Sequence, residues 1–178
     1  MTQTRPPAEA PAPARPWHAT QAPPRPKALT TVVATASSVI ALTLLVAVGE
    51  WSHQVLLIPP LAASMALIAG ASQTPLGQPR SVIGGQLVSA LTGFLVLAVL
   101  GQGVWSSGLA GGLALGAMLL LRVAHSPAAA TAVIVAATAT APSAVPFLTL
   151  LAAATVLLVL VGLVGNRVNR QAYPVYWW

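Results

Sequence analysis

Long apolar runs, separated by short polar or turn-forming stretches, dominate the chain after residue 28. A membrane-spanning α-helix needs about 20 predominantly apolar residues to cross a hydrocarbon core ~30 Å thick. The long runs approach this length, so they predict membrane-spanning helices and an all-α bundle. Four of them are long, and they cover residues 29–49, 82–100, 108–121 and 147–165.

Two further apolar segments are shorter, and proline stands near the start of each. They read PPLAASMALIAGASQTP over residues 59–75 and HSPAAATAVIVAATATAP over residues 125–142. Proline suits the first position of a helix, where its missing N–H costs nothing, and Ser126 is placed to cap the second helix. A helix over residues 60–74 would be only about 23 Å long. Each short segment therefore either crosses with help from its flanks or dips into the membrane and returns.

The two short segments align at one constant offset, which indicates an internal repeat. The matched pairs include Pro60 with Pro127, Pro75 with Pro142, and Ser64 with Thr131. The pseudo-repeats would cover about residues 29–100 and 104–165, each with one short helix at its centre. Three crossings in each half would make the halves inverted relative to one another, an architecture known from secondary transporters.

The charges help to choose between six and four crossings. Six crossings with a cytoplasmic N-terminus place every Lys and Arg inside and Glu50 outside, as the positive-inside rule requires. If both short segments re-enter, Arg80 and Arg122 fall outside. We therefore expect six crossings with both termini cytoplasmic, as in a multi-pass protein of a bacterial inner membrane, and keep a four-span bundle as the alternative.

Composition supports a membrane location. The chain is 56% hydrophobic and 6% charged, whereas soluble domains carry about 25% charged residues. Such a chain lacks the polar surface to face water, so its main partner should be the lipid bilayer. Residues 1–28 differ, because they are rich in proline and alanine and carry four basic residues. We expect this stretch to be a disordered cytoplasmic tail ahead of a membrane domain at 29–178.

Several classes of function are unfavoured by the sequence. The basic residues are scattered, so nucleic-acid binding is not expected. No cysteine is present, and three histidines and two glutamates are widely separated, so we expect no metal site and no cofactor. No nucleophile–base pair or carboxylate pair is visible, so we do not expect an enzyme.

The chemistry that remains favours a small anion. A proline-opened helix with small residues behind it exposes backbone N–H groups, which attract anions together with the helix dipole. Nearby hydroxyls add neutral donors, and a histidine can take up a proton near physiological pH. The candidate substrate-binding residues are Arg80, Gln78, Ser64, His125, Ser126 and Thr131. The alternative interpretation is that proline and alanine simply let two short helices pack tightly.

Three stretches resemble the HPP family of integral membrane proteins. They are PLGQPRSVIGGQLVSALTG at 75–93, HSPAAATA at 125–132 and NRVNRQAYPVYWW at 166–178. The resemblance covers about residues 29–178, although Ser126 stands where the family usually has the first proline of its His-Pro-Pro signature. It implies a protein usually described with four membrane helices, and some plant and cyanobacterial members are linked to nitrite transport.

Two functional hypotheses follow. The first is a membrane transporter or channel-like carrier for a small anion, with nitrite as the first candidate. The second is a non-transporting membrane subunit or scaffold for a partner protein, motivated by the scarcity of polar residues inside the apolar runs. Glycine-rich helix faces would also allow a homo-oligomer.

Overall fold

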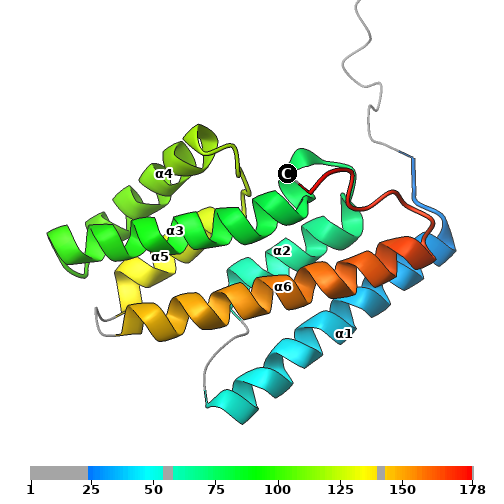
Figure 1. Cartoon of the computed structure of the whole chain (residues 1–178), viewed down its shortest axis with the longest axis horizontal. Coiled ribbons are helices and arrows are strands. Elements are labelled where there is room, and N and C mark those ends of the chain that lie inside the picture. The colour runs from blue at the N-terminus through cyan, green and yellow to red at the C-terminus, as the bar shows by residue number, and fades with distance from the viewer. Residues whose placement is uncertain (1–23, 54–57, 140–142, 178) are drawn as a thin grey trace, which may run out of the picture.

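The computed structural model describes residues 24–53, 58–139 and 143–177. The predicted tail therefore lies almost entirely outside the described residues. Within them the chain is helical and has no strand, as the apolar runs predicted, and Figure 1 shows how the helices lie. The elements are α1 (Ala28–Ser52), α2 (Pro59–Gly70), the 3₁₀ turn η1 (Pro75–Gly77), α3 (Pro79–Leu100), α4 (Val104–Leu120), α5 (Ala128–Thr138) and α6 (Ala144–Val168).

Helix length divides these elements into two groups. The helices α1, α3 and α6 have 25, 22 and 25 residues and are apolar enough to cross a membrane. The fourth predicted long helix, α4, has only 17 residues. The proline-opened helices α2 and α5 have 12 and 11 residues, so at 1.5 Å per residue each is under about 20 Å long. Neither can cross a bilayer core by itself.

The helices pack in a symmetric pattern. α3, α4 and α5 pack on one another, α1, α2 and α6 do the same, and the pairs α3–α6 and α2–α5 join the two groups (Figure 1). Exchanging α1 with α4, α2 with α5 and α3 with α6 leaves this set of packed α-helix pairs unchanged. An inverted repeat of three helices produces packing of this kind.

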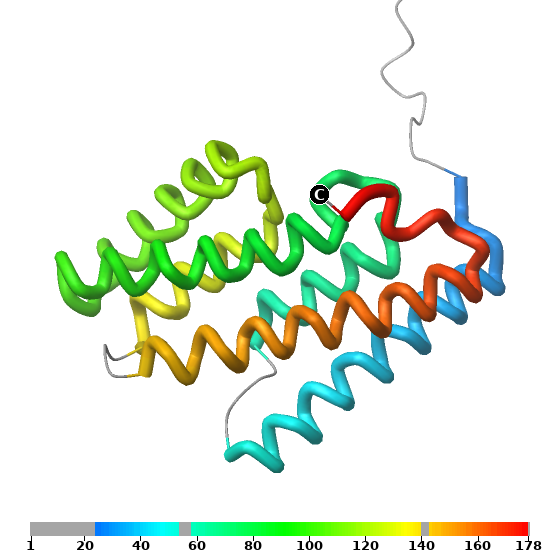
Figure 2. The backbone as a smooth tube through the Cα atoms, viewed as in Figure 1, coloured from blue at the N-terminus to red at the C-terminus, as the bar shows by residue number. Residues whose placement is uncertain are grey.

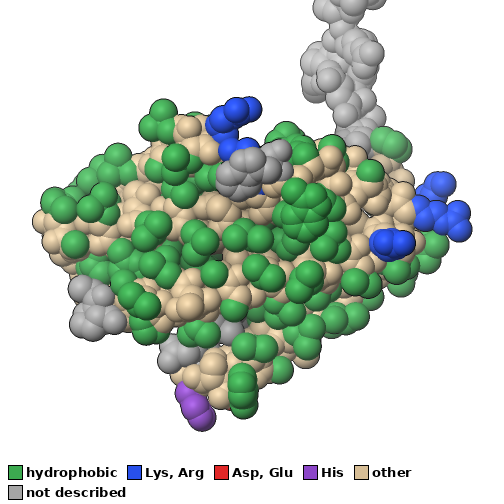
Figure 3. Space-filling view, viewed as in Figure 1, with side chains coloured by type: hydrophobic (Ala, Val, Ile, Leu, Met, Phe, Trp, Pro, Cys, Tyr) green, Lys and Arg blue, Asp and Glu red, His purple; other side chains and the backbone are tan. Residues whose placement is uncertain are grey.

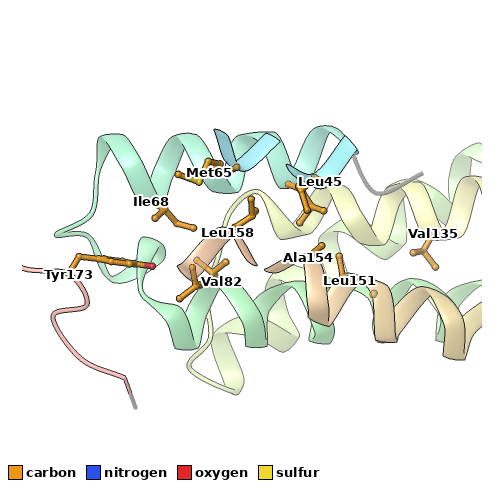
Figure 4. Packing of buried hydrophobic residues seen from close by; sticks show 13 residues of the cluster. Leu45, Met65, Ile68, Val82, Val135, Leu151, Ala154, Leu158 and Tyr173 are labelled. Atoms are coloured by element: carbon orange, nitrogen blue, oxygen red, sulfur yellow. The ribbon is translucent and has the colours of Figure 1, made fainter. Parts of the chain in front are cut away.

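The main hydrophobic core lies where the helices of the first half meet α6. Figure 4 shows Leu45 of α1, Met65 and Ile68 of α2, Val82 of α3 and Leu158 of α6 close together. All five side chains are fully buried. Burying a side chain of this size contributes about 1.5–3 kcal/mol, so this core holds the first half against α6.

Large apolar side chains lie on the surface of the bundle as well as in its interior. Large hydrophobic side chains are exposed along α1, α3, α4 and α6, and green hydrophobic atoms cover much of the face seen in Figure 3. Soluble monomers rarely expose apolar patches beyond a few hundred Å². The bundle is therefore a membrane protein whose outer surface contacts lipid.

The described basic residues lie in two groups joined by the C-terminal segment, which together are called the basic end. The Asn169 side chain donates to the Thr30 carbonyl over 3.3 Å, which places the end of α6 beside the start of α1. The Arg80 guanidinium donates to the Leu121 carbonyl over 3.3 Å, which places the start of α3 beside the end of α4. The C-terminal segment, red in Figure 2, connects these two places. The basic residues at this end are Arg25, Lys27, Arg80, Arg122, Arg167 and Arg170.

Candidate functional site

Four polar side chains meet inside the bundle and form one hydrogen-bonded unit, the polar cluster: Ser64, Gln86, His125 and Thr131. All four are fully buried. The Gln86 amide donates to Ser64 Oγ over 3.0 Å, and its carbonyl oxygen accepts from Thr131 Oγ1 over 2.5 Å. Ser64 Oγ also lies 2.7 Å from His125 Nε2. An unpaired polar group in an apolar interior costs several kcal/mol, and these mutual bonds avoid that cost.

The hydrogen bonds place a hydrogen on one nitrogen of the histidine ring. His125 Nδ1 lies 2.7 Å from the Leu76 carbonyl oxygen, which can only accept, so Nδ1 carries a hydrogen. In the neutral ring Nε2 then has a free lone pair, and Ser64 Oγ–H donates to it. Leu76 belongs to η1, so the loop between α2 and α3 covers the histidine.

Glycine on α3 makes room for His125. A Cβ added at Gly85 would lie 2.7 Å from both His125 Cβ and the Val123 carbonyl oxygen. At Gly93 an added Cβ would lie 2.8 Å from the Ala132 carbonyl oxygen. These distances are shorter than van der Waals contact, so only glycine permits the approach. The glycines of 82–100 thus bring α5 and the segment before it against α3.

A cavity of about 220 Å³ lies between α2, α5 and the start of α6, about one helical turn from the polar cluster. Leu61 lines it from α2 and Val135 from α5, while Phe147 closes the side toward α6. Ser64 is one helical turn beyond Leu61, and Thr131 is one turn before Val135, so both hydroxyls continue the cavity-lining faces. The polar cluster does not itself line the cavity but lies one turn further along both helices.

Gln78 has a different environment from the polar cluster. It is fully buried, and its amide donates to the Ser72 and Thr74 carbonyls over 2.8 and 3.0 Å. Its carbonyl oxygen accepts the backbone N–H of Val175 over 2.8 Å. Gln78 thus ties the loop after α2 to the C-terminal segment and acts on the cluster only through that loop.

Arg80 and Ser126 also lie outside the polar cluster. Arg80 binds the Leu121 carbonyl at the basic end. Ser126 is exposed, and the predicted cap is wrong: Pro127 occupies the N-cap position of α5, and no side chain caps the helix. Proline takes that place because its fixed φ, here −59°, already suits the helix.

The backbone N–H groups predicted to face an anion already have partners. The N–H groups of Ala128, Ala129 and Ala130 donate to carbonyls three residues earlier, over 2.9, 3.3 and 3.3 Å. At α2, Leu61 and Ala62 both donate to the Ile58 carbonyl, over 3.0 and 3.4 Å. These five N–H groups at the two helix ends are therefore not unpaired donors waiting for an anion.

Sequence reasoning missed Gln86, which joins the two halves of the cluster. It also missed Ser89, which lies one turn further along α3 and is fully buried. Within the described structure, the Ser89 hydroxyl has no hydrogen-bond partner. Gln86 is the one side-chain amide in the apolar run 82–100. Polar side chains within membrane helices usually face the bundle interior and bond to neighbouring helices. This tendency was the sequence signal that could have identified Gln86.

Comparisons with known proteins agree with this architecture. Residues 23–174 match the family described as HPP, transmembrane region. A transmembrane protein of Dictyostelium discoideum is 33% identical over 138 residues, which cover 70% of this chain and 42% of that protein. A second from the same organism is 30% identical over 129 residues, 68% of this chain and 45% of the relative. The chain thus spans less than half the length of both relatives.

No solved structure matches the chain. The family match covers most of the sequence, including every helix described above. This chain belongs to the HPP family of transmembrane proteins.

Proposed function

We propose that the protein is a transporter or channel-like carrier for a small anion, with nitrite as the first candidate. The observation that carries this proposal is the polar cluster, which is fully buried about one helical turn from a cavity between the two halves of the bundle. Secondary transporters built from inverted repeats bind their substrates in this position, near the middle of the membrane.

The chemistry of the cluster suits an anion. Its hydroxyls and its amide are neutral donors that could turn from one another toward a ligand. Glu50, the one acidic residue in the described part of the chain, is exposed near the end of α1, so no negative side chain there opposes an anion at the cluster. The cavity of about 220 Å³ is smaller than the ~300–1,000 Å³ of pockets for drug-sized ligands, which favours a small substrate.

We further propose the orientation of the bundle. The positive-inside rule assigns the basic end to the cytoplasm, in a bacterial cell at the inner membrane. The cavity is lined by Ser143, Pro146 and Phe147 at the start of α6, and Arg167 lies in the last turn of that helix. The cavity would therefore open toward the outside, and the loop over His125 would close the cytoplasmic side.

Anion uptake into proteoliposomes tests the proposal. Gln86→Glu keeps the size of the side chain but adds a negative charge at the cluster. Like charges placed together cost several kcal/mol, so we expect nitrite uptake to fall at least about tenfold. Gln171→Glu is the matched control, because Gln171 is exposed beyond the end of α6, and its uptake should equal that of the wild type.

If folded, inserted wild-type protein moves no nitrite, nitrate or formate under any gradient, the proposal fails.

The second candidate function is a non-transporting membrane subunit or scaffold. It is favoured by the complete mutual hydrogen bonding of the polar cluster, which a purely structural role would also produce. A stoichiometric partner recovered from mild detergent, together with full function after replacement of Arg80 and of His125, would support this candidate.

A further inference from the structure

We propose that His125 carries a proton together with the anion, so that one anion and one proton cross as an electroneutral pair. This inference rests on the proposed anion transport and adds the coupling ion and the residue that binds it. It is carried by the hydrogen bonds on both ring nitrogens and by the charges around the ring.

The hydrogen bonds accommodate the ring with or without its second proton. Ser64 Oγ lies 2.7 Å from His125 Nε2 and 2.8 Å from the Pro60 carbonyl oxygen, and its hydroxyl has one hydrogen to donate. With a neutral ring, that hydrogen points to Nε2. With a protonated ring, Nε2–H donates to Ser64 Oγ, and the hydroxyl hydrogen turns to Pro60. The Leu76 carbonyl accepts from Nδ1–H in both states.

Within the hydrogen-bond network, proton uptake therefore changes only the direction of the Ser64 hydroxyl. A new N–H bond forms at Nε2 with a proton taken from water on one side of the membrane. The same bond breaks when the proton is released to water on the other side. The Gln86 amide can donate to Ser64 Oγ in both states, so protonation by itself breaks no bond of the polar cluster.

The surroundings of the ring provide no negative charge in the described structure. The helices α2, α4 and α5 and the turn η1 contain no titratable residue, and α3 contains only Arg80. Arg122, three residues before His125, is also basic. Tyr173, on the C-terminal segment that covers the α2–α3 loop, is neutral. Glu50 belongs to α1, which packs against α2 and α6.

This charge pattern couples the proton to the anion. A lone imidazolium in a buried site pays a desolvation penalty without compensation, and so does a lone anion. Together they form a neutral pair, so each should raise the affinity of the other, and the two effects must be equal by linkage. The site should therefore be occupied by both ions or by neither.

Transport by the wild-type protein tests the coupling without any mutation. Nitrate is the probe, because nitric acid is too strong an acid to carry protons across lipid in its neutral form. We expect accumulation to follow an imposed pH gradient, about tenfold per pH unit, and acidification of a dye-loaded lumen by one proton per nitrate. A potential set with potassium and valinomycin should have no effect.

The outcomes separate this inference from the proposed function. Nitrate uptake that follows the membrane potential and moves no protons would overturn proton coupling while leaving anion transport intact. Absence of exchange for nitrate, nitrite and formate alike would instead refute the proposed function.

A second measurement assigns the proton to His125. The chain contains three histidines, His18, His53 and His125, which ¹⁵N labelling makes visible by NMR in detergent. We expect nitrate to convert one signal toward the imidazolium form, and we expect this response to be lost in His125→Gln. His53→Asn is the control: His53 is exposed with φ 55°, a conformation that asparagine tolerates.

The control variant should keep the full nitrate response. A wild-type spectrum that nitrate does not change, or a response that survives in His125→Gln, would overturn the assignment.

Discussion

Ser64 and Thr131 occupy equivalent positions in the two proline-opened segments, and Gln86 bonds to both. The sequence offset paired these two hydroxyls, and both are fully buried. In an inverted repeat, matched residues that lie close to the pseudo-two-fold axis approach one another where the two halves meet. Gln86 has an amide donor for one hydroxyl and a carbonyl acceptor for the other, which explains why this residue type suits the position.

The Thr131 hydroxyl is predicted to matter for both stability and uptake. Thr131→Val keeps the shape of the side chain but leaves the buried Gln86 carbonyl oxygen without its donor. A buried acceptor without a partner costs about 1–3 kcal/mol, so we expect lower thermal stability in detergent and reduced nitrite uptake. Thr131→Ser restores the hydroxyl and should recover most of both. Equal stability and uptake in Thr131→Val and the wild type would show that the hydroxyl is dispensable.

Gly85 is predicted to be essential for the position of His125. In Gly85→Ala the new methyl group would lie 2.7 Å from His125 Cβ, so the loop must move, at a cost of about 1–3 kcal/mol. Gly112→Ala on α4 is the matched control, because nothing lies within 4 Å of an added Cβ there. Since alanine is the better helix former, the control should be neutral or slightly stabilising. Thermal unfolding of the two variants measures the difference, and similar melting would contradict the account.

At the scale of single elements, the C-terminal segment holds the α2–α3 loop over the cluster. Besides Gln78, the Gln73 amide donates to the Ala172 carbonyl, and Tyr173 extends from the segment toward Ile68 (Figure 4). Because the Leu76 carbonyl in this loop bonds to His125, the segment influences the candidate site from outside the helices.

This connection predicts a change in local dynamics. Gln78→Met conserves size but removes the three hydrogen bonds of the side chain, so residues 72–78 and 171–175 should open more readily. Hydrogen exchange followed by mass spectrometry should show faster exchange in both stretches, with α1 unchanged. The exposed Gln171→Met is the control and should exchange like the wild type. Protection unchanged in Gln78→Met would show that other contacts hold the loop.

The success of the sequence predictions differs between kinds of element. The long apolar runs located α1, α3 and α6 to within three residues at each end, because bilayer-length hydrophobicity is a strong local signal. The start of α4 was placed four residues late, since Ser106 and Ser107 read as loop. In the structure the Ser107 hydroxyl donates to the Gly103 carbonyl one turn earlier. This bond satisfies the hydroxyl within the first turn of an apolar helix.

The site was harder to predict than the helices. Three of the six predicted residues, Ser64, His125 and Thr131, do meet in the polar cluster. The others do not belong to it, and Gln86 was missed. Which polar residues meet depends on how helices distant in sequence pack, and that information is absent from a local pattern.

At the scale of the whole molecule, the grouping of basic residues at one end predicts the topology. The starts of α1 and α3 and the ends of α4 and α6 share that end. Accessibility tags placed after Arg80 and after Arg122 should therefore both report the cytoplasm, as the six-crossing topology requires. Either tag reporting the outside would refute that topology and favour the four-span bundle.

The central claim, that this bundle carries a small anion, is tested most directly by nitrite counterflow in proteoliposomes. Vesicles loaded with unlabelled nitrite should take up labelled nitrite faster and to a higher transient level than vesicles without protein, with saturation at high external nitrite. The rate should fall at least about tenfold in Gln86→Glu and remain unchanged in Gln171→Glu. Counterflow indistinguishable from that of protein-free vesicles, with the protein shown to be folded and inserted, would contradict the claim.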